Sequence, residues 1–359
     1  MARYNAKGFS DEEVEYYSRQ MVLNEIGSAG QLLLKRAKVC VVGLGGLGSP
    51  LSVQLASMGV GHLRVIDRDI VEISNLQRQH LYGVDVIGYP KVEAAAMRLR
   101  RLNPFVEIEP VPMSLSSENA EKLIGGVDVV VDGLDRMAPR YALNRACVKL
   151  DIPYIFGAVL THIGNVTTII PRKTACLECF HGGINDDSLP TCAVVGVNPS
   201  IINIVASIQA SEAVKIILGR APSLENTLLF CDLSSLAFER IALARAETCP
   251  VCGLKPKARA SPIEREPVEE ICGRDGRRVF IFSVVDDQHL DMKTLNDRIH
   301  ELELCPDVEA VMGTSFSGSS GFKGSVLSSG VVIIEGMESR ENAEKLRDKL
   351  IKIARSPPL

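Results

Sequence analysis

The chain has 359 residues, of which 46% are hydrophobic and 23% are charged, and its formal net charge is −4. This length is sufficient for one large α/β domain together with a smaller one. The slightly acidic balance and the lack of a polybasic run argue against nucleic acid or an anionic membrane as the partner. The N-terminal residues lack the apolar core of a signal peptide, and no apolar run reaches the about 18 residues of a membrane span, so we expect a cytoplasmic protein.

The first part of the chain alternates between strand and helix patterns. Residues 10–36 are expected to be helical, with Ser10 as the N-cap. Strands are then expected at 39–42, 63–66, 106–110 and 127–131, and helices at 49–58, 90–102 and 117–124. This βαβ alternation predicts a doubly wound, mostly parallel Rossmann-like α/β sheet, whose site lies at the carboxyl ends of the strands.

The second part of the chain is expected to end the large domain and to add a small one. Strands at 154–158 and 166–170 and an apolar helix at 199–218 complete a domain over residues 1–253. Residues 254–267 are rich in Lys, Pro, Arg and Ala, which is typical of a linker. Residues 268–359 are expected to form a small α+β domain of βαββα order, which would recruit a partner. Within it, the Gly/Ser-rich stretch 313–324 is interpreted as a mobile hairpin loop rather than a phosphate site.

A glycine-rich turn follows the first predicted strand. Gly43, Gly45 and Gly46 come directly after an apolar run, and glycines at this point let backbone amides approach a phosphate at the start of a helix. Asp67 ends the second strand, where an acid can accept hydrogen bonds from ribose hydroxyls, and Asp69 follows it closely. On these residues alone, a nicotinamide-dependent dehydrogenase is the favoured interpretation.

A dense polar cluster follows the two acids and separates the alternatives. Asn75, Arg78 and Gln79 lie in the run Asn-Leu-Gln-Arg-Gln, which favours a triphosphate over a dinucleotide. A dehydrogenase leaves this cluster unexplained. A third hypothesis, a non-catalytic scaffold, predicts loss of the phosphate ligands, and they are present.

Four of the ten cysteines form two Cys-x-x-Cys pairs, Cys176 with Cys179 and Cys249 with Cys252. Two such pairs in one domain predict a tetrahedral Cys₄ zinc site. A thioredoxin-like redox dithiol is the alternative, because one pair alone has that spacing. Cys40, Cys147, Cys231, Cys272 and Cys305 are expected to be buried packing residues.

From about residue 16 to residue 253, the sequence resembles the adenylating enzymes that activate ubiquitin and ubiquitin-like sulfur carriers, including those of the molybdopterin and thiamin pathways. The resemblance implies that the chain binds MgATP. It implies nucleotide-binding roles for Gly43, Gly45, Gly46, Asp67, Asp69, Asn75, Arg78, Gln79 and Lys91. Of these, Arg78 and Lys91 would also act on the phosphates during catalysis.

The resemblance also assigns an acid to the metal and an arginine to a partner subunit. Asp135 is similar to the acid that holds Mg²⁺, although an acid there can also simply cap the next helix. The family usually has Asn after this acid, whereas this chain has Arg136, which adds a positive charge close to the metal. Arg19 matches an arginine that reaches the ATP of the neighbouring subunit, which implies a homodimer, although alone it would be an ordinary surface residue.

Cys192 is the candidate acceptor thiol. It precedes an apolar helix whose dipole would favour a thiolate, and in ubiquitin-activating relatives a cysteine forms a thioester with the modifier. The implied substrate is the C-terminal carboxylate of a small β-grasp protein with a Gly-Gly tail. We expect the acyl-adenylate to pass to Cys192 for transfer to a conjugating enzyme, because ubiquitin-activating relatives use an appended domain like the one after residue 254 to recruit the next enzyme. The alternative is that a sulfur donor converts the acyl-adenylate to a thiocarboxylate, and the sequence does not decide between the two.

Overall fold

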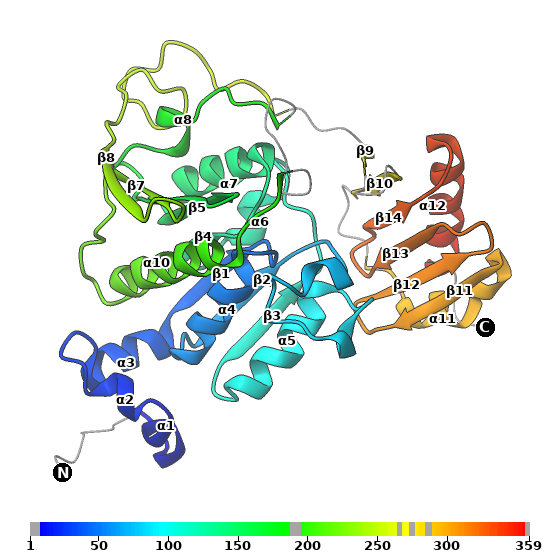
Figure 1. The fold of residues 1–359 in the computed structure, drawn as a ribbon, viewed down its shortest axis with the longest axis horizontal. Coiled ribbons are helices and arrows are strands. Elements are labelled where there is room, and N and C mark those ends of the chain that lie inside the picture. Colours follow the sequence, from blue (N-terminus) through cyan, green and yellow to red (C-terminus); the bar gives the residue numbers. More distant parts are fainter. Residues whose placement is uncertain (1–7, 187–194, 264–267, 273–276, 284–288, 356–359) are drawn as a thin grey trace.

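A computed structural model describes residues 8–186, 195–263, 268–272, 277–283 and 289–355. These residues form two sheets, each with its own helices (Figure 1). The larger sheet has eight strands, which lie side by side in the order β3 (Glu107–Val111), β2 (His62–Ile66), β1 (Lys38–Val42), β4 (Val129–Asp132), β5 (Tyr154–Leu160), β6 (Ile163–Ile169), β7 (Thr227–Asp232) and β8 (Ala237–Ala242).

The first five of these strands in spatial order pair in parallel, and the last three are antiparallel. This arrangement confirms the expected α/β class with a mostly parallel Rossmann-like sheet. The helices and short 3₁₀ turns of this part are α1 (Asp11–Tyr16), α2 (Ser18–Met21), α3 (Gly27–Arg36), α4 (Gly48–Ser57), η1 (Ile73–Asn75), η2 (Val84–Val86), α5 (Lys91–Leu102), α6 (Ala120–Ile124), α7 (Met137–Leu150), α8 (Leu177–Phe180) and α10 (Pro199–Ile217).

Helices cover both faces of the sheet, and strand β1 contributes to both cores. Val39 and Val41 belong to the core that includes residues of α4, α5 and α10, whereas Cys40 and Val42 belong to the core that includes residues of α6 and α7. Alternate side chains of a strand point to opposite faces, so a strand buried on both sides reads as a continuous apolar run. This is why β1 was predictable from sequence.

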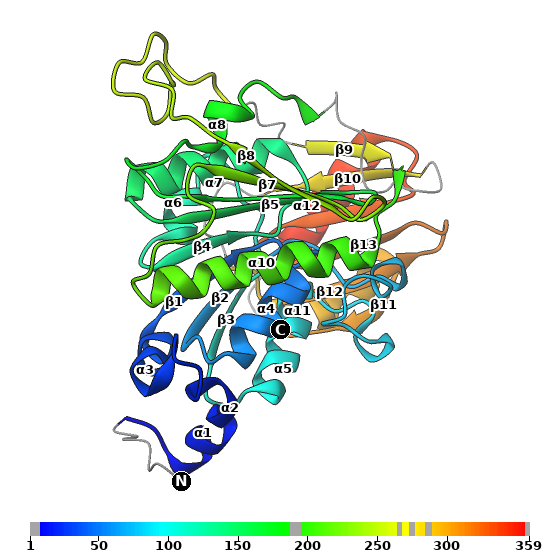
Figure 2. The same ribbon diagram turned by 60° about the vertical axis from the view of Figure 1, so that its left-hand side comes forward.

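Helix α10 is long and apolar enough to cross a membrane by length and composition, and it is the one such helix among the described residues. Half of its apolar window is buried in the fold. Figure 2 shows α10 lying across the sheet, and its apolar residues Ile201, Val205 and Ala213 contribute to the core. Such packing is typical of a core helix.

Strands β7 and β8 and helix α7 were not predicted. Strand β8 is largely solvent-exposed, and Phe238 and Ile241 are 50% and 46% exposed. It therefore lacks the apolar alternation by which a half-buried strand is recognised. Its partner β7 pairs with β6 and extends the sheet beyond the parallel part.

The second sheet is antiparallel and forms a separate C-terminal domain. Its strands lie in the order β11 (Leu304–Glu309), β12 (Gly313–Gly318), β13 (Lys323–Leu327), β14 (Val332–Glu335), β10 (Arg278–Phe282) and β9 (Val268–Cys272). Helices α11 (Met292–Arg298) and α12 (Arg340–Ala354), with the turn η4 (Ile299–Leu302), accompany the sheet. The interpretation of 313–324 as a mobile hairpin loop was wrong, because most of it forms β12 and β13, whose Phe316 and Val326 are buried in the core of this domain.

Candidate active site

The glycine-rich turn between β1 and α4 can be formed only by glycine at two points. Gly43 has a φ of +86°, and a Cβ there would lie 2.6 Å from the carbonyl oxygen of Gly133. A Cβ on Gly48 would lie 1.8 Å from the carbonyl oxygen of Gly43. By contrast, the nearest atom to a Cβ on Gly45 would be Nε2 of Gln79 at 3.9 Å. The turn is therefore tight at its base and open at Gly45, as a phosphate site requires.

Asp67 is fixed at the carboxyl end of β2 beside this turn. Its carboxylate accepts hydrogen bonds from the backbone N–H of Leu44 at 2.6 Å and of Asp69 at 2.8 Å. Burial raises the pKa of Asp67, Lys91 opposes this shift, and the neighbouring Asp69 adds to it. The acid is thus held by the same loop that carries the glycines, in the position expected for a ribose contact.

Lys91 is the first residue of α5, and its side chain is almost fully buried. Its ammonium donates to Asp69 at 2.8 Å. Burial opposes the charge on Lys91, but Asp69 and Asp67 raise its pKa, so the side chain is cationic. Burial also opposes the charge on Asp69, and Lys91 and Arg68 lower its pKa. The structure thus brings the predicted residues of β2 and α5 into one charged group.

The polar cluster contains a buried atom that has no partner. Asn75 is 6% exposed and accepts the backbone N–H of Glu72 at 3.2 Å, and Arg78 donates to the carbonyl of Ser74 at 2.8 Å. Gln79 is 3% exposed, and its Oε1 has no hydrogen-bond partner among the described residues. Leaving a buried polar atom unpaired costs about 1–3 kcal/mol, so Gln79 beside the open Gly45 suits a ligand contact.

Two acids near the end of β4 have different environments. Asp135 is exposed and lies in the loop before α7. Asp132 is fully buried and accepts hydrogen bonds from Nε of Arg140 at 3.0 Å and from the hydroxyl of Tyr154 at 2.7 Å. Burial raises the pKa of Asp132, with Arg140 and Tyr154 opposing the shift. The sequence analysis missed Asp132, although an acid ending an apolar strand was a usable signal.

Arg136 does not leave an uncompensated charge beside Asp135. Its guanidinium donates to Glu269 at 2.7 Å and lies 3.8 Å from Asp186. The expected conflict between Arg136 and a metal ion is therefore reduced by two carboxylates. Neither partner could be identified from the motif, because Glu269 lies 133 residues away in the C-terminal domain.

Arg19 is exposed on α2 and lies away from the glycine turn of its own chain. Its neighbour Gln20 donates to the carbonyl of Met58, which follows the last residue of α4. Helix α4 begins at Gly48 and has ten residues, so its ends lie about 15 Å apart. Arg19 is therefore near the amino edge of the sheet, where its own nucleotide site is out of reach. Cys192 lies outside the described residues.

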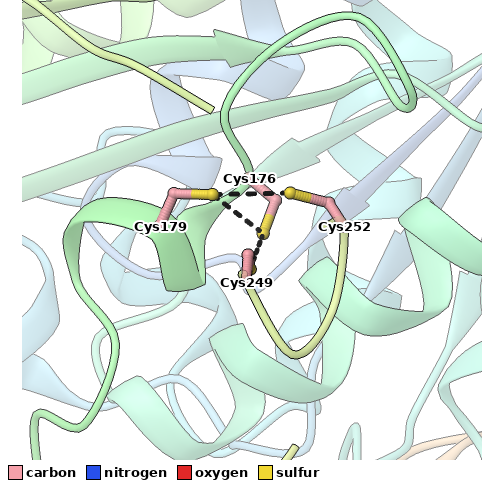
Figure 3. A group of neighbouring side chains, drawn as sticks. All are labelled: Cys176, Cys179, Cys249 and Cys252. Atoms are coloured by element: carbon pink, nitrogen blue, oxygen red, sulfur yellow. Dashed lines mark hydrogen bonds between the residues drawn. The ribbon is translucent and has the colours of Figure 1, made fainter. Parts of the chain in front are cut away.

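The four paired cysteines converge on one point (Figure 3). Their sulfur atoms all lie within 4.8 Å of one another, and the hydrogen-bonded pairs are 4.0, 3.7 and 3.4 Å apart. Zinc bound tetrahedrally at about 2.3 Å from each sulfur needs sulfur pairs about 3.8 Å apart. The cluster fits a structural Zn²⁺, which would tie the end of the large domain to α8.

Of the other cysteines, Cys40, Cys147 and Cys231 are buried as predicted. The prediction was wrong for Cys305, which is exposed on the outer strand β11. An edge strand has a neighbouring strand on one side only, so its side chains are less covered, and β11 is exposed at the consecutive residues 305–307. The side chain of Cys272 lies outside the described residues.

The geometry brings the predicted nucleotide-binding residues together at the carboxyl ends of β1, β2 and β4. A tight glycine turn, an acid that is fixed to this turn by a backbone hydrogen bond, and a buried ammonium lie close together. An exposed acid, Asp135, follows β4 and offers the oxygen ligand that Mg²⁺ prefers. Such a site can bind a nucleoside triphosphate with its metal and stabilise charge that develops on the phosphates.

Comparison with known proteins agrees with this geometry. The chain is 40% identical over 242 residues to the SAMP-activating enzyme E1 of Haloferax volcanii, which covers 67% of this chain and 89% of that protein. It is 39% identical over 271 residues to the sulfur carrier protein adenylyltransferase of Thermus thermophilus, covering 74% of this chain and 98% of that protein.

The fold is also similar to a solved enzyme. The structure of Escherichia coli MccB with MccA-N7isoASN superposes with a TM-score of 0.61 at 24% identity, covering 69% of this chain and 76% of that one. At this identity the similarity supports the fold alone. Residues 17–251 match the ThiF family, so they include the glycine turn, the charged group and three of the four clustered cysteines, with Cys252 one residue beyond the match. The chain therefore belongs to the ThiF family.

Proposed function

We propose that the chain transfers AMP from ATP to the C-terminal glycine carboxylate of a small ubiquitin-like sulfur carrier. The enzyme class, an ATP-dependent adenylating enzyme, follows from the ThiF family and from its relatives. The observation that carries the proposal is the convergence of the open glycine turn, Asp67 and the buried Lys91 at one edge of the sheet. A sulfur carrier is preferred because relatives at 39% and 37% identity are named for sulfur-carrier and molybdopterin-synthase adenylylation.

In this reaction a carboxylate oxygen of the carrier attacks the α-phosphorus of ATP. A phosphorus–oxygen bond forms to the carboxylate, the bond to the β-phosphate oxygen breaks, and pyrophosphate leaves. Lys91 and Arg78 would stabilise the charge on the phosphates, and Asp135 would hold the Mg²⁺ that accompanies them. Asn75 and Gln79 would position the nucleotide beside Gly45 and Gly46, and Asp69 would keep Lys91 in place.

The next step is part of the same proposal. A sulfur nucleophile attacks the acyl-adenylate and AMP leaves. The thiol of Cys192 would give a thioester, whereas the persulfide of a sulfur donor would give an acyl disulfide on the carrier. A second thiol of the donor must then attack the S–S bond, which releases the thiocarboxylate and leaves a disulfide on the donor. The thioester would be passed on to a conjugating enzyme, whereas formation of the thiocarboxylate requires a sulfur donor. We further propose that the protein is a homodimer, because Arg19 lies beyond reach of its own site and would serve the site of a second copy. We also propose that this homodimer is cytoplasmic.

The test is exchange of labelled pyrophosphate into ATP with a panel of purified β-grasp proteins that end in Gly-Gly. We expect exchange with at least one carrier, and loss of exchange when its last glycine is deleted. Exchange with no carrier, combined with tight binding of NADH, would replace the proposal with the dehydrogenase hypothesis.

A further inference from the structure

The C-terminal domain contacts the large domain next to the residues that we assign to ATP. Three of the segments that make these contacts adjoin residues that we assign to ATP: one follows Asp67, one begins α5 with Lys91, and one follows Asp135. Each segment contributes a charged side chain, and these are Arg68, Glu93 and Arg136. The ThiF match ends at residue 251, so the domain that makes these contacts lies outside it.

The central contact is a carboxylate shared by two arginines. Glu269 of β9 accepts from Arg68 through both oxygens, at 2.7 and 2.9 Å, and from Arg136 at 2.7 Å. Arg68 and Arg136 follow β2 and β4, which are separated in the sheet only by β1. Glu269 therefore connects the loops on both sides of β1, the strand that leads into the glycine turn. Paired contacts of this kind with a guanidinium are directional as well as strong.

The next residue of β9, Glu270, is an acid of the same type that, within the described part of the chain, has no ion pair with the large domain. Glu270 pairs at 2.6 Å with Arg278 of β10, within its own sheet, and is exposed. Neighbouring residues of a strand point to opposite faces, so only Glu269 is directed at the large domain. Burial opposes the charge on Glu269, but Arg68 and Arg136 lower its pKa, so it is ionised at neutral pH.

Two further contacts fix the position of the C-terminal domain. The carboxylate of Glu93 accepts the backbone N–H groups of Val311 at 3.1 Å and of Met312 at 2.7 Å. The hydroxyl of Ser283, which follows β10, donates to that of Ser114 at 3.0 Å. Glu93 is two residues from Lys91, so this part of the domain also lies close to the start of α5.

We propose that the C-terminal domain is a gate to the nucleotide site and that Glu269 is the positioning residue that holds the gate closed. This inference rests on the proposed function, because it places ATP between the segments that Glu269 connects. A closed gate would keep the acyl-adenylate from dissociating and from water until the attacking sulfur arrives. Opening requires that Glu269 leave both arginines.

The test is the dissociation rate of a fluorescent ATP analogue, measured by displacement with excess ATP and Mg²⁺. Glu269→Gln removes the charge but keeps the shape, and we expect dissociation about tenfold faster, equivalent to 1.4 kcal/mol, with the rate of adenylation at saturating ATP unchanged. The matched control is Glu270→Gln, which should release nucleotide as the wild type does. Equal rates for the wild type and Glu269→Gln would overturn the gate, whereas a wild type that binds no nucleotide would overturn the proposed function itself.

A reversible crosslink tests the gate independently of Glu269. The Ser114 and Ser283 hydroxyl oxygens are 3.0 Å apart, so cysteines at both positions are close enough to form a disulfide. The oxidised double variant should bind and release nucleotide at least about tenfold more slowly, and reductant should restore both rates, since a closed lid limits exchange. Nucleotide exchange at the same rate in the oxidised and reduced protein would refute the gate. Each single cysteine variant serves as the control.

Discussion

Replacing Asp132 by Ala should destabilise the large domain strongly, because its carboxylate is shared by several buried groups. Asp132 has no exposed surface, and it accepts from Arg140 at 3.0 Å, from Tyr154 at 2.7 Å and from the backbone N–H of Leu134 at 2.7 Å. The change leaves the Arg140 guanidinium buried without its counterion and removes the acceptor of two other donors.

The expected loss of stability is the cost of leaving Arg140 unpaired, reduced by the cost of burying the charge of Asp132 that the substitution removes. Removing one partner of a buried ion pair costs about 3–5 kcal/mol. The raised pKa of Asp132 indicates that burial already makes its charge costly, and Arg140 keeps hydrogen bonds to the carbonyls of Leu134 and Gly157. We therefore expect the lower end, about 3 kcal/mol, which corresponds to a fall in Tm of about 6–12 °C for a domain of this size.

The assay is calorimetric unfolding of Asp132→Ala beside Asp135→Ala. Asp135 is exposed, so its variant should unfold within about 0.5 kcal/mol of the wild type, yet pyrophosphate exchange should fall about a hundredfold or more if it holds Mg²⁺. A Tm for Asp132→Ala within two degrees or so of the wild type would refute the account of the buried pair. Full exchange activity of a folded Asp135→Ala protein would assign the metal to another acid.

The remaining predictions concern the zinc, the dimer, acid stability and the thiol. The protein should contain about one zinc per chain by elemental analysis, and Cys176→Ser should lose the metal together with thermal stability. Arg19→Ala mixed with Asp135→Ala should regain exchange activity after subunit exchange, while neither alone is active, and no recovery would refute a shared site. Burial opposes the charge on Glu212, but the hydrogen bond from Lys215, followed by those from Leu224, Ser223 and Thr168, lowers its pKa below the usual 4.5. The stabilisation from Glu212 should therefore be complete above pH 4.5 and should be lost as the pH falls through the lowered pKa, and Glu212→Gln should flatten the dependence of the unfolding free energy on pH in that window. If Cys192 accepts the carrier, MgATP should produce an adduct on non-reducing gels that thiols remove, and Cys192→Ala should lose the adduct but keep exchange.

Several features were predictable because short-range patterns encode them. The run before Gly43 is apolar throughout and buried on both faces, and the glycines follow it directly, so the strand and the turn are both visible in sequence. The two Cys-x-x-Cys pairs predicted a cluster, and their sulfurs meet within 4.8 Å. Helix α12 is likewise encoded locally, because its N-cap Ser339 and its apolar spacing lie within one segment.

Other features were decided only by tertiary packing. The sequence places Asp132 and Asp135 three residues apart, but the fold buries one against Arg140 and exposes the other. In sequence Arg136 adds a surplus positive charge beside Asp135, but in the fold Glu269 pairs with it, and nothing local to either residue indicates this pairing. Strand β8 and the strands within 313–324 depend on pairing with neighbours rather than on their own hydrophobicity. The sequence by itself determined which chemical groups are present and the segments that carry them; the tertiary structure decided which charges are paired and buried, because those contacts join residues far apart in the chain.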